Sequence, residues 1–219
     1  MPMHNIILFD LDGTLIDTSP GIFSTANGTL RKLGFKELSD TQLRKFVGPP
    51  LAACFRVACG LEEQIISHAC DVYREIYAQT GALFDAETYQ NVPELLSNLV
   101  ARGFTLGVAT LKYDSLAVEV LTHFSLQEYF SVVSGADLDG KLTKADIIRN
   151  ALTTLKCTDY QRVLMVGDTP HDLDGALEVG VDFVGVDWGF GFSKGHSISG
   201  QKGVLGMIDT PLSLLDYID

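Results

Sequence analysis

The chain has 219 residues, of which 46% are hydrophobic, so it is long enough for one substantial core and a smaller accessory unit. Its 28 acidic residues against 16 lysines and arginines give a formal net charge of −12, which disfavours nucleic acid and anionic membrane surfaces as partners. The sequence also lacks a basic signal-peptide start, a Cys-x-x-Cys pair and any apolar run near the roughly 18 residues of a spanning helix. We therefore expect a cytoplasmic protein with reduced thiols and no membrane or nucleic-acid partner.

The first apolar run, residues 5–9, is followed by two aspartates, Asp10 and Asp12, and then by Gly13. The run predicts a buried parallel strand, and open α/β sheets bind ligands at the carboxyl edge, where such a strand ends. Because Gly13 lets the chain turn there, both carboxylates can converge on one small space. Crowded carboxylates repel each other, so the pair requires a metal ion, a lysine or a shared proton. Taken alone, the same residues also match an ordinary Asp-Gly turn.

The segment that follows predicts helices and no strand. The expected helices span residues 19–33, 40–46, 50–58 and 62–80. We expect residues 18–82 to form an all-helical cap over the edge of the sheet, and residues 1–17 and 83–219 to form the core.

From residue 93 onwards, strands and helices alternate. The expected elements are a helix at 93–102, a strand at 104–109, a helix at 114–123, a strand at 130–134, a helix at 143–155, a strand at 162–166, a helix at 171–179 and a strand at 182–186. This alternation predicts an α/β fold with a doubly wound parallel sheet. The run 162–166 is followed by Asp168 and Asp172, so a second strand delivers acids to the edge that carries Asp10 and Asp12.

Two lysines, Lys144 and Lys112, are candidates for the lysine that lies beside these acids. Lys144 lies in Thr143-Lys144-Ala145-Asp146, which opens a helix, and the amides of a helix N-terminus also favour anions. Lys112 lies just past a strand. We expect Lys144 to be the site lysine. Lys112 is expected to be solvated, with a contact to phosphate as the alternative, so its role is left open.

Four segments, in chain order, resemble the motifs of the haloacid dehalogenase superfamily of phosphohydrolases, in particular its phosphoglycolate phosphatase-like branch. These are Asp10-Leu11-Asp12-Gly13-Thr14, the strand end Val108-Ala109-Thr110, Lys144 at its helix start, and the acidic segment from Gly167 to Asp172. The stretch 135–140 is similar to that of 5′-nucleotidase-like relatives. The resemblance implies a Rossmann-like core with a helical cap inserted after the first motif.

The resemblance also implies roles for these residues. Asp10 is the expected nucleophile, which forms an aspartyl-phosphate, and Asp12 the expected acid and base. Thr110, the adjoining Leu111 and Lys144 are the expected phosphate-binding residues.

A magnesium ion is the expected cofactor, because an all-oxygen, carboxylate-rich set suits Mg²⁺. Its expected ligands are Asp10, the backbone carbonyl of Asp12, and Asp168. Asp172 is expected to orient a metal-bound water or to pair with Lys144.

The expected function is Mg²⁺-dependent hydrolysis of a small phosphorylated metabolite, of the phosphoglycolate or nucleoside 5′-monophosphate class. A phosphomutase of the β-phosphoglucomutase kind, or a non-catalytic phosphate-sensing or partner-binding module, are the alternatives. Pro49, Pro50 and Arg56 in the cap are candidate specificity residues. The aromatic loop 188–192 either packs on the core or shapes the pocket, and the oligomeric state is left open.

Overall fold

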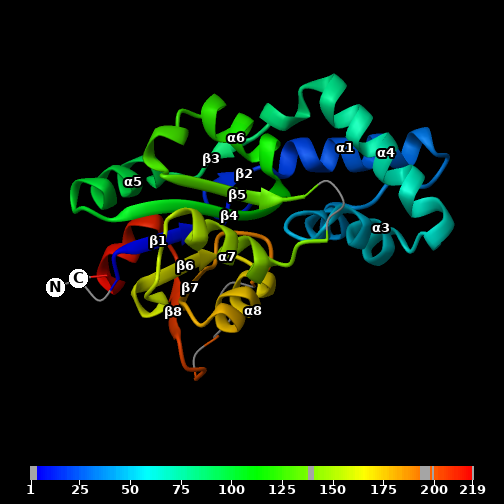
Figure 1. Cartoon of the computed structure of the whole chain (residues 1–219). Coiled ribbons are helices and arrows are strands. Elements are labelled where there is room, and N and C mark those ends of the chain that lie inside the picture. Colours follow the sequence, from blue (N-terminus) through cyan, green and yellow to red (C-terminus); the bar gives the residue numbers. More distant parts are fainter. Residues whose placement is uncertain (1–3, 138–140, 193–197, 199, 219) are drawn as a thin grey trace.

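The computed structural model describes residues 4–137, 141–192, 198 and 200–218, and within them six parallel strands form one sheet (Figure 1). The strand order is β5-β4-β1-β6-β7-β8. The strands are β1 (Ile6–Phe9), β4 (Thr105–Tyr113), β5 (Val132–Ala136), β6 (Val163–Gly167), β7 (Asp182–Val186) and β8 (Val204–Ile208). The predicted doubly wound α/β fold is confirmed. The order places β1 beside β6, with Phe9 opposite Val166.

Helices cover both faces of this sheet, because successive strand residues point to opposite faces and both faces are apolar. Ile7 and Phe9 of β1 pack with α5 (Val92–Ala101) and α6 (Asp114–His123) in one core cluster. Ile6 and Leu8 pack in another cluster with α7 (Lys144–Thr154) and α8 (Pro170–Val179). Three short 3₁₀ helices complete the described part of this region, η3 (Gln127–Tyr129), η4 (Tyr160–Arg162) and η5 (Pro211–Tyr217).

The predicted cap segment is helical and lies between two short strands, β2 (Ile16–Asp17) and β3 (Glu87–Thr88), which pair antiparallel. Its elements are α1 (Ser19–Lys32), α2 (Asp40–Leu43), η1 (Arg44–Phe46), α3 (Leu51–Cys59), α4 (Glu63–Thr80) and η2 (Ala82–Phe84). Figure 1 shows α1, α3 and α4 together beyond the end of the sheet toward which the arrows of β1 and β5 point. We call residues 18–82 the insert; the boundary between core and cap stays a prediction.

The structure corrects several expected strand positions. The strand predicted to end at residue 109 runs on to Tyr113, and its pairing with β5 shifts register between Ala109 and Tyr113. The strands β2, β3 and β8 were not predicted. β2 and β3 have two residues each, which is too few for a strand pattern, and the apolar residues of β8 are interrupted by Gly206 and mostly half-buried. No helix in the described part of the chain has both the length and the apolar character needed to cross a membrane.

Candidate active site

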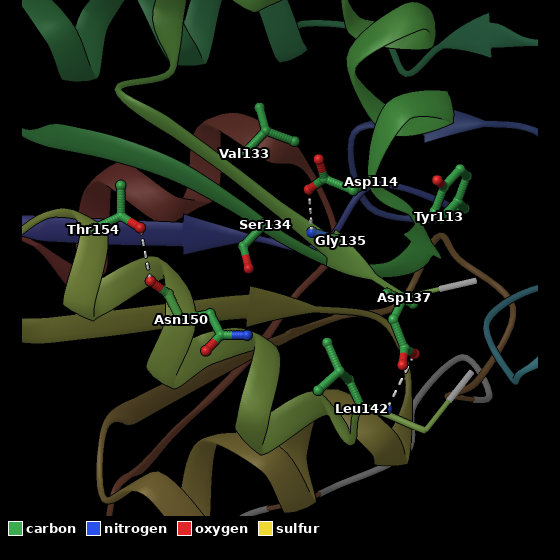
Figure 2. A pocket seen from close by; sticks show the side chains of 10 residues that line it. Tyr113, Asp114, Val133, Ser134, Gly135, Asp137, Leu142, Asn150 and Thr154 are labelled. Carbon is green, nitrogen blue, oxygen red and sulfur yellow. Dashed lines mark hydrogen bonds between the residues drawn. The ribbon is translucent and has the colours of Figure 1, made fainter. Parts of the chain in front are cut away.

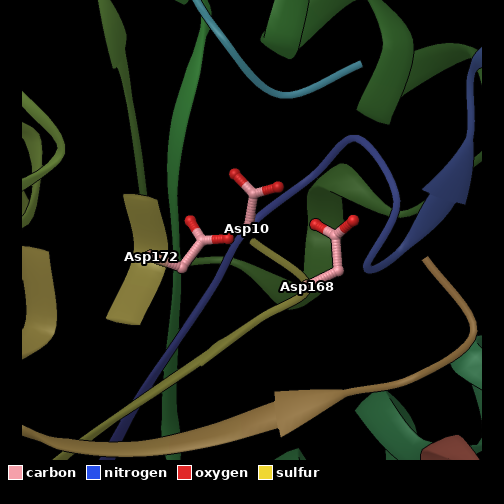
Figure 3. A group of neighbouring side chains, drawn as sticks. All are labelled: Asp10, Asp168 and Asp172. Carbon is pink, nitrogen blue, oxygen red and sulfur yellow. The ribbon is translucent and has the colours of Figure 1, made fainter. Parts of the chain in front are cut away.

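Two aspartates lie side by side at the carboxyl edge of the sheet because their strands are neighbours. Asp10 directly follows β1, and its backbone N–H donates to the carbonyl of Val166 in β6 at 2.9 Å. Asp168 directly follows β6. Figure 3 shows these two carboxylates together with that of Asp172, and one oxygen from each lies within 4.8 Å of the others. All three residues are buried.

Lys144 holds two of these three acids. Its Nζ lies 2.5 Å from Asp10 Oδ1 and 2.6 Å from Asp172 Oδ1, and its side chain is 3% exposed. The residue opens α7, whose start is fixed by the reciprocal capping hydrogen bonds of Thr143 and Asp146. The helix cap therefore delivers the ammonium to the acids, as predicted from the helix-start pattern.

The three carboxylates outnumber the one ammonium beside them, and two of them, Asp10 and Asp168, have raised pKa values. Burial raises the pKa of Asp10 well above its ordinary value, against the attraction of Lys144, and the charges of Asp172 and Asp168 raise it further. Burial, followed by the charge of Asp172, raises the pKa of Asp168 to about 7. Burial disfavours the charged form of Lys144, but Asp10 and Asp172 outweigh it and the pKa lies above its ordinary value. Three carboxylates thus face one ammonium, and their all-oxygen donor set fits a hard divalent cation such as Mg²⁺.

Asp12 has a lysine of its own, which corrects the expectation that Lys112 is solvated. Lys112 Nζ lies 3.0 Å from Asp12 Oδ1 and its side chain is 8% exposed. The hydroxyl of Thr18 donates to the same carboxylate oxygen at 2.7 Å, so two donors orient Asp12. Lys112 Nζ also lies 3.5 Å from the hydroxyl of Tyr77, on α4 of the insert. The site therefore contains both lysines, each on a different acid.

The predicted phosphate-binding residues Thr110 and Leu111 lie on β4, and Asp172 lies in the first turn of α8. Thr110 is buried within β4 rather than at its end, and its hydroxyl accepts the N–H of Lys112 at 3.1 Å. Leu111 is half-buried beside it. Asp172 Oδ2 accepts from the backbone N–H of Thr169 at 2.9 Å and from its hydroxyl at 2.7 Å. These hydrogen bonds form the N-terminal cap of α8, so Asp172 stabilises the start of this helix and also pairs with Lys144.

The predicted specificity residues lie on α3 and the loop before it. Arg56 forms an exposed ion pair with Glu63 on the insert. The carbonyl of Pro49 accepts the thiol of Cys54 at 3.4 Å, and Pro50 precedes the first residue of α3. The loop reaches the core at Gly48, where an added Cβ would lie 3.0 Å from Thr169 Cγ2. The roles of Pro49, Pro50 and Arg56 stay predictions.

The aromatic loop 188–192 is part of the site, which sequence reasoning had left undecided. The N–H of Phe190 donates to Asp168 Oδ2 at 2.7 Å. The indole N–H of Trp188 donates to the carbonyl of Thr14 at 3.2 Å. A Cβ on Gly189 would lie 2.3 Å from Asp168 Oδ2, so only glycine permits this approach. The Gly-x-Gly spacing directly after a strand is the signal from which close packing could have been predicted.

A separate pocket of about 570 Å³ lies along β5 (Figure 2). Its lining residues include Tyr113, Asp114 and Asn150 and none of the acids or lysines described above. The carboxylate of Asp137 at its rim accepts the backbone N–H groups of Lys141 and Leu142 at 2.8 and 3.4 Å. Residues 138–140 of the predicted 5′-nucleotidase-like stretch lie outside the described residues.

Comparison with known families places the chain in one of them over most of its length. Residues 7–186 match the family model described as haloacid dehalogenase-like hydrolase. A structure described as that of a predicted phosphatase from Clostridium acetobutylicum superposes with a TM-score of 0.87 at 34% sequence identity, covering 98% of this chain and 99% of that one.

Three of the similar curated proteins differ in name. The 5′-nucleotidase of Pseudomonas aeruginosa is 41% identical over 186 residues, which is 84% of this chain and 83% of that protein. Tyrosine-protein kinase PtkA of Mycobacterium tuberculosis is 36% identical over 187 residues, and the match covers 85% of this chain and 63% of that protein. The phosphoglycolate phosphatase of Vibrio parahaemolyticus is 28% identical over 205 residues, covering 90% of this chain and 89% of that protein. The predicted resemblance is thereby confirmed.

Proposed function

The chain belongs to the haloacid dehalogenase-like hydrolase family, and we propose that it is a Mg²⁺-dependent phosphatase that hydrolyses small phosphomonoesters through an aspartyl-phosphate. One observation carries the proposal. Asp10, at the end of the central strand β1, has Lys144 Nζ at 2.5 Å and the buried acids Asp168 and Asp172 beside it. A carboxylate nucleophile next to a fixed ammonium and a cation-binding cluster suits transfer of a phosphoryl group through a covalent intermediate.

In the first step, a carboxylate oxygen of Asp10 forms a bond to phosphorus while the bond from phosphorus to the ester oxygen breaks. Asp12 gives its proton to the departing oxygen, so that an alcohol leaves rather than an alkoxide. The hydrogen bond from Thr18 and the ammonium of Lys112 hold the Asp12 carboxyl in one orientation. Lys144 offsets negative charge on Asp10 and on the phosphoryl oxygens.

In the second step, water attacks the phosphorus of the aspartyl-phosphate and the acyl-phosphate bond breaks, which regenerates the Asp10 carboxylate. Asp12, now ionised, takes the proton of that water. The same side chain therefore acts as an acid and then as a base. Inorganic phosphate and the alcohol are the products.

Asp10 and Asp168, with the backbone carbonyl of Asp12, would hold Mg²⁺ in this scheme. The cation supplies positive charge that offsets repulsion between the anionic substrate and the carboxylates. The raised pKa values of Asp10 and Asp168 agree with this assignment: burial and then the neighbouring carboxylate charges disfavour their ionised forms, and a cation would offset both effects.

We further propose that the substrate is a nucleoside 5′-monophosphate or phosphoglycolate. The names of two relatives support these classes. Residues that contact only the phosphoryl group cannot discriminate between these two substrate classes, because every phosphomonoester presents the same phosphoryl group. Discrimination needs side chains that contact the rest of the substrate, and the insert lies over the edge of the sheet that carries the acids.

Tyrosine phosphorylation is a second candidate function, which the identity to PtkA favours. The test is to incubate the purified chain and its Asp10→Asn variant with Mg²⁺ and a panel of esters that includes phosphoglycolate, nucleoside 5′-monophosphates and β-glucose 1-phosphate. A parallel incubation contains Mg²⁺, ATP and a tyrosine peptide. Release of inorganic phosphate by the wild type alone supports the phosphatase. Isomerisation of the sugar phosphate without release supports a mutase, and transfer from ATP to a tyrosine peptide without ester hydrolysis supports the kinase. Either result overturns the proposal.

A further inference from the structure

The loop 188–192 packs closely against Asp168. The N–H of Phe190 donates to Asp168 Oδ2 at 2.7 Å, and the N–H of Phe192 donates to the backbone carbonyl of Asp168 at 2.9 Å. An added Cβ on Gly191 would lie 2.7 Å from that carbonyl oxygen. A displacement of this loop therefore moves the hydrogen-bond donor that orients the Asp168 carboxylate.

The other side of the same loop is held by the insert. Arg44, in η1, donates from Nη2 to the carbonyl of Gly189 at 3.1 Å, and its guanidinium carbon lies 5.0 Å from the centre of the Phe190 ring. Phe23, in α1, makes an edge-to-face contact with Phe190, with ring centres 6.4 Å apart. Two elements of the insert thus converge on one residue of a core loop.

From this arrangement, we infer that Arg44 is a positioning residue: it holds the loop 188–192 in place and thereby sets the orientation of Asp168 and the affinity of the site for a divalent cation. The inference rests on the Mg²⁺ requirement of the proposed function. A guanidinium suits this task because its planar fork donates a hydrogen bond while its face lies on an aromatic ring. A lysine ammonium at the same place has no planar face to stack and no second fixed donor direction.

Trp188, the single tryptophan of the chain, makes the loop observable without any substrate. Its indole donates to Thr14, so its fluorescence reports where the loop lies against the core. The experiment titrates Mg²⁺ into the full chain, without substrate, and records Trp188 emission and the heat of binding. The variants are Arg44→Ala and Arg44→Lys, with Arg74→Ala as the matched control, because Arg74 is an exposed insert arginine that pairs with Asp71.

Residues that directly orient a metal ligand change metal affinity about 10- to 100-fold when mutated, and Arg44 acts one contact further away. We therefore expect Arg44→Ala to weaken Mg²⁺ binding about 3- to 10-fold and to change Trp188 emission. Arg44→Lys is expected to recover less than half of the lost affinity on a logarithmic scale, and Arg74→Ala to match the wild type. Phe190→Leu keeps the backbone donor but removes the ring, so it should weaken binding similarly. The double variant with Arg44→Ala should then be little worse than either single one.

Failure of the inference and failure of the proposed function give different results. If Arg44→Ala binds Mg²⁺ as tightly as the wild type while the wild type hydrolyses esters, the positioning role is wrong and the function stands. If affinity and Trp188 emission shift as expected but no ester is hydrolysed, the function is wrong and the positioning role stands. A wild type that binds no Mg²⁺ overturns both.

Discussion

Replacing Asp168 by asparagine should stabilise the protein in the absence of a divalent cation. The Asp168 carboxylate is fully buried, and Asp172 lies close enough for its charge to raise the Asp168 pKa. Asparagine has almost the same shape, and its carbonyl oxygen can still accept the N–H of Phe190. The substitution therefore removes a buried negative charge and leaves the loop contact in place.

The size of the effect follows from the pKa of Asp168. Burial first, and then the charge of Asp172, raises this pKa from 3.8 to about 7. At roughly 1.4 kcal/mol for each pKa unit, ionisation of Asp168 above pH 7 lowers the free energy of unfolding by about 4 kcal/mol. Loss of the charge on the hydrogen bond from Phe190 offsets about 1 kcal/mol of this. We expect Asp168→Asn to unfold with a free energy about 2 to 3 kcal/mol higher than the wild type at pH 8 in excess chelator.

The pH dependence of this difference has a definite sign. A carboxyl with a raised pKa binds its proton more tightly in the folded state, so protonation stabilises the fold and ionisation weakens it. The contribution of Asp168 to the stability of the wild type therefore falls as the pH rises from about 4 to about 7 and does not change further above that range. The asparagine variant lacks this contribution. Its advantage should be small near pH 4 and complete by pH 8.

Urea denaturation with and without Mg²⁺ is the assay. A cation at about 100 times its dissociation constant stabilises the wild type by about 2.7 kcal/mol, so Mg²⁺ should remove most of the advantage of the variant. An Asp168→Asn protein that is less stable than the wild type in chelator at pH 8 would refute the reasoning. So would an advantage that does not change between pH 4 and pH 8.

Three further predictions concern catalysis. Asp10→Asn should lower turnover about 1,000-fold or more and leave the fold intact, measured as phosphate release and circular dichroism; hydrolysis above a trace would exclude covalent catalysis at Asp10. Asp12→Ala should slow formation of the aspartyl-phosphate far more from alkyl esters than from nitrophenyl phosphate, whose leaving group needs less protonation; equal losses in rapid-quench experiments would count against Asp12 as the acid. Substitutions at Pro50 and Arg56 should change relative kcat/KM values among esters about tenfold and leave the Mg²⁺ dependence unchanged. If these substitutions in the insert change kcat/KM by the same factor for every ester, and substitutions at Trp188 change the order of preference among esters, the specificity site lies on the core loop.

The convergence of acids at one edge was predictable because it depends on local patterns alone. Apolar runs that end in Asp10 and Asp168 indicate parallel strands, and parallel strands of one sheet end at the same edge. The place of Lys144 followed from a capping pattern that occupies only a few residues. Such signals need no knowledge of how distant segments meet.

The contacts made by Lys112 and by Arg44 were not predictable in this way. Lys112 reaches Asp12 because β4 continues irregularly past Ala109, and the strand pattern does not show such a continuation. Arg44 contacts Gly189, which is 145 positions further along the chain. Its place in the sequence, within the predicted helix 40–46, is equally typical of a solvated side chain.

The pairing of β2 with β3 constrains how the insert can move. The chain enters the insert after Asp17 and leaves it before Glu87, and these two residues are partners in the same antiparallel ladder. Both connections therefore pass through one two-stranded ribbon rather than through two separated linkers. A ribbon of this kind bends across its face far more easily than it shears along its hydrogen bonds. Rotation of the insert would thus take place about one hinge axis, which lies in the chain only a few residues from Asp12.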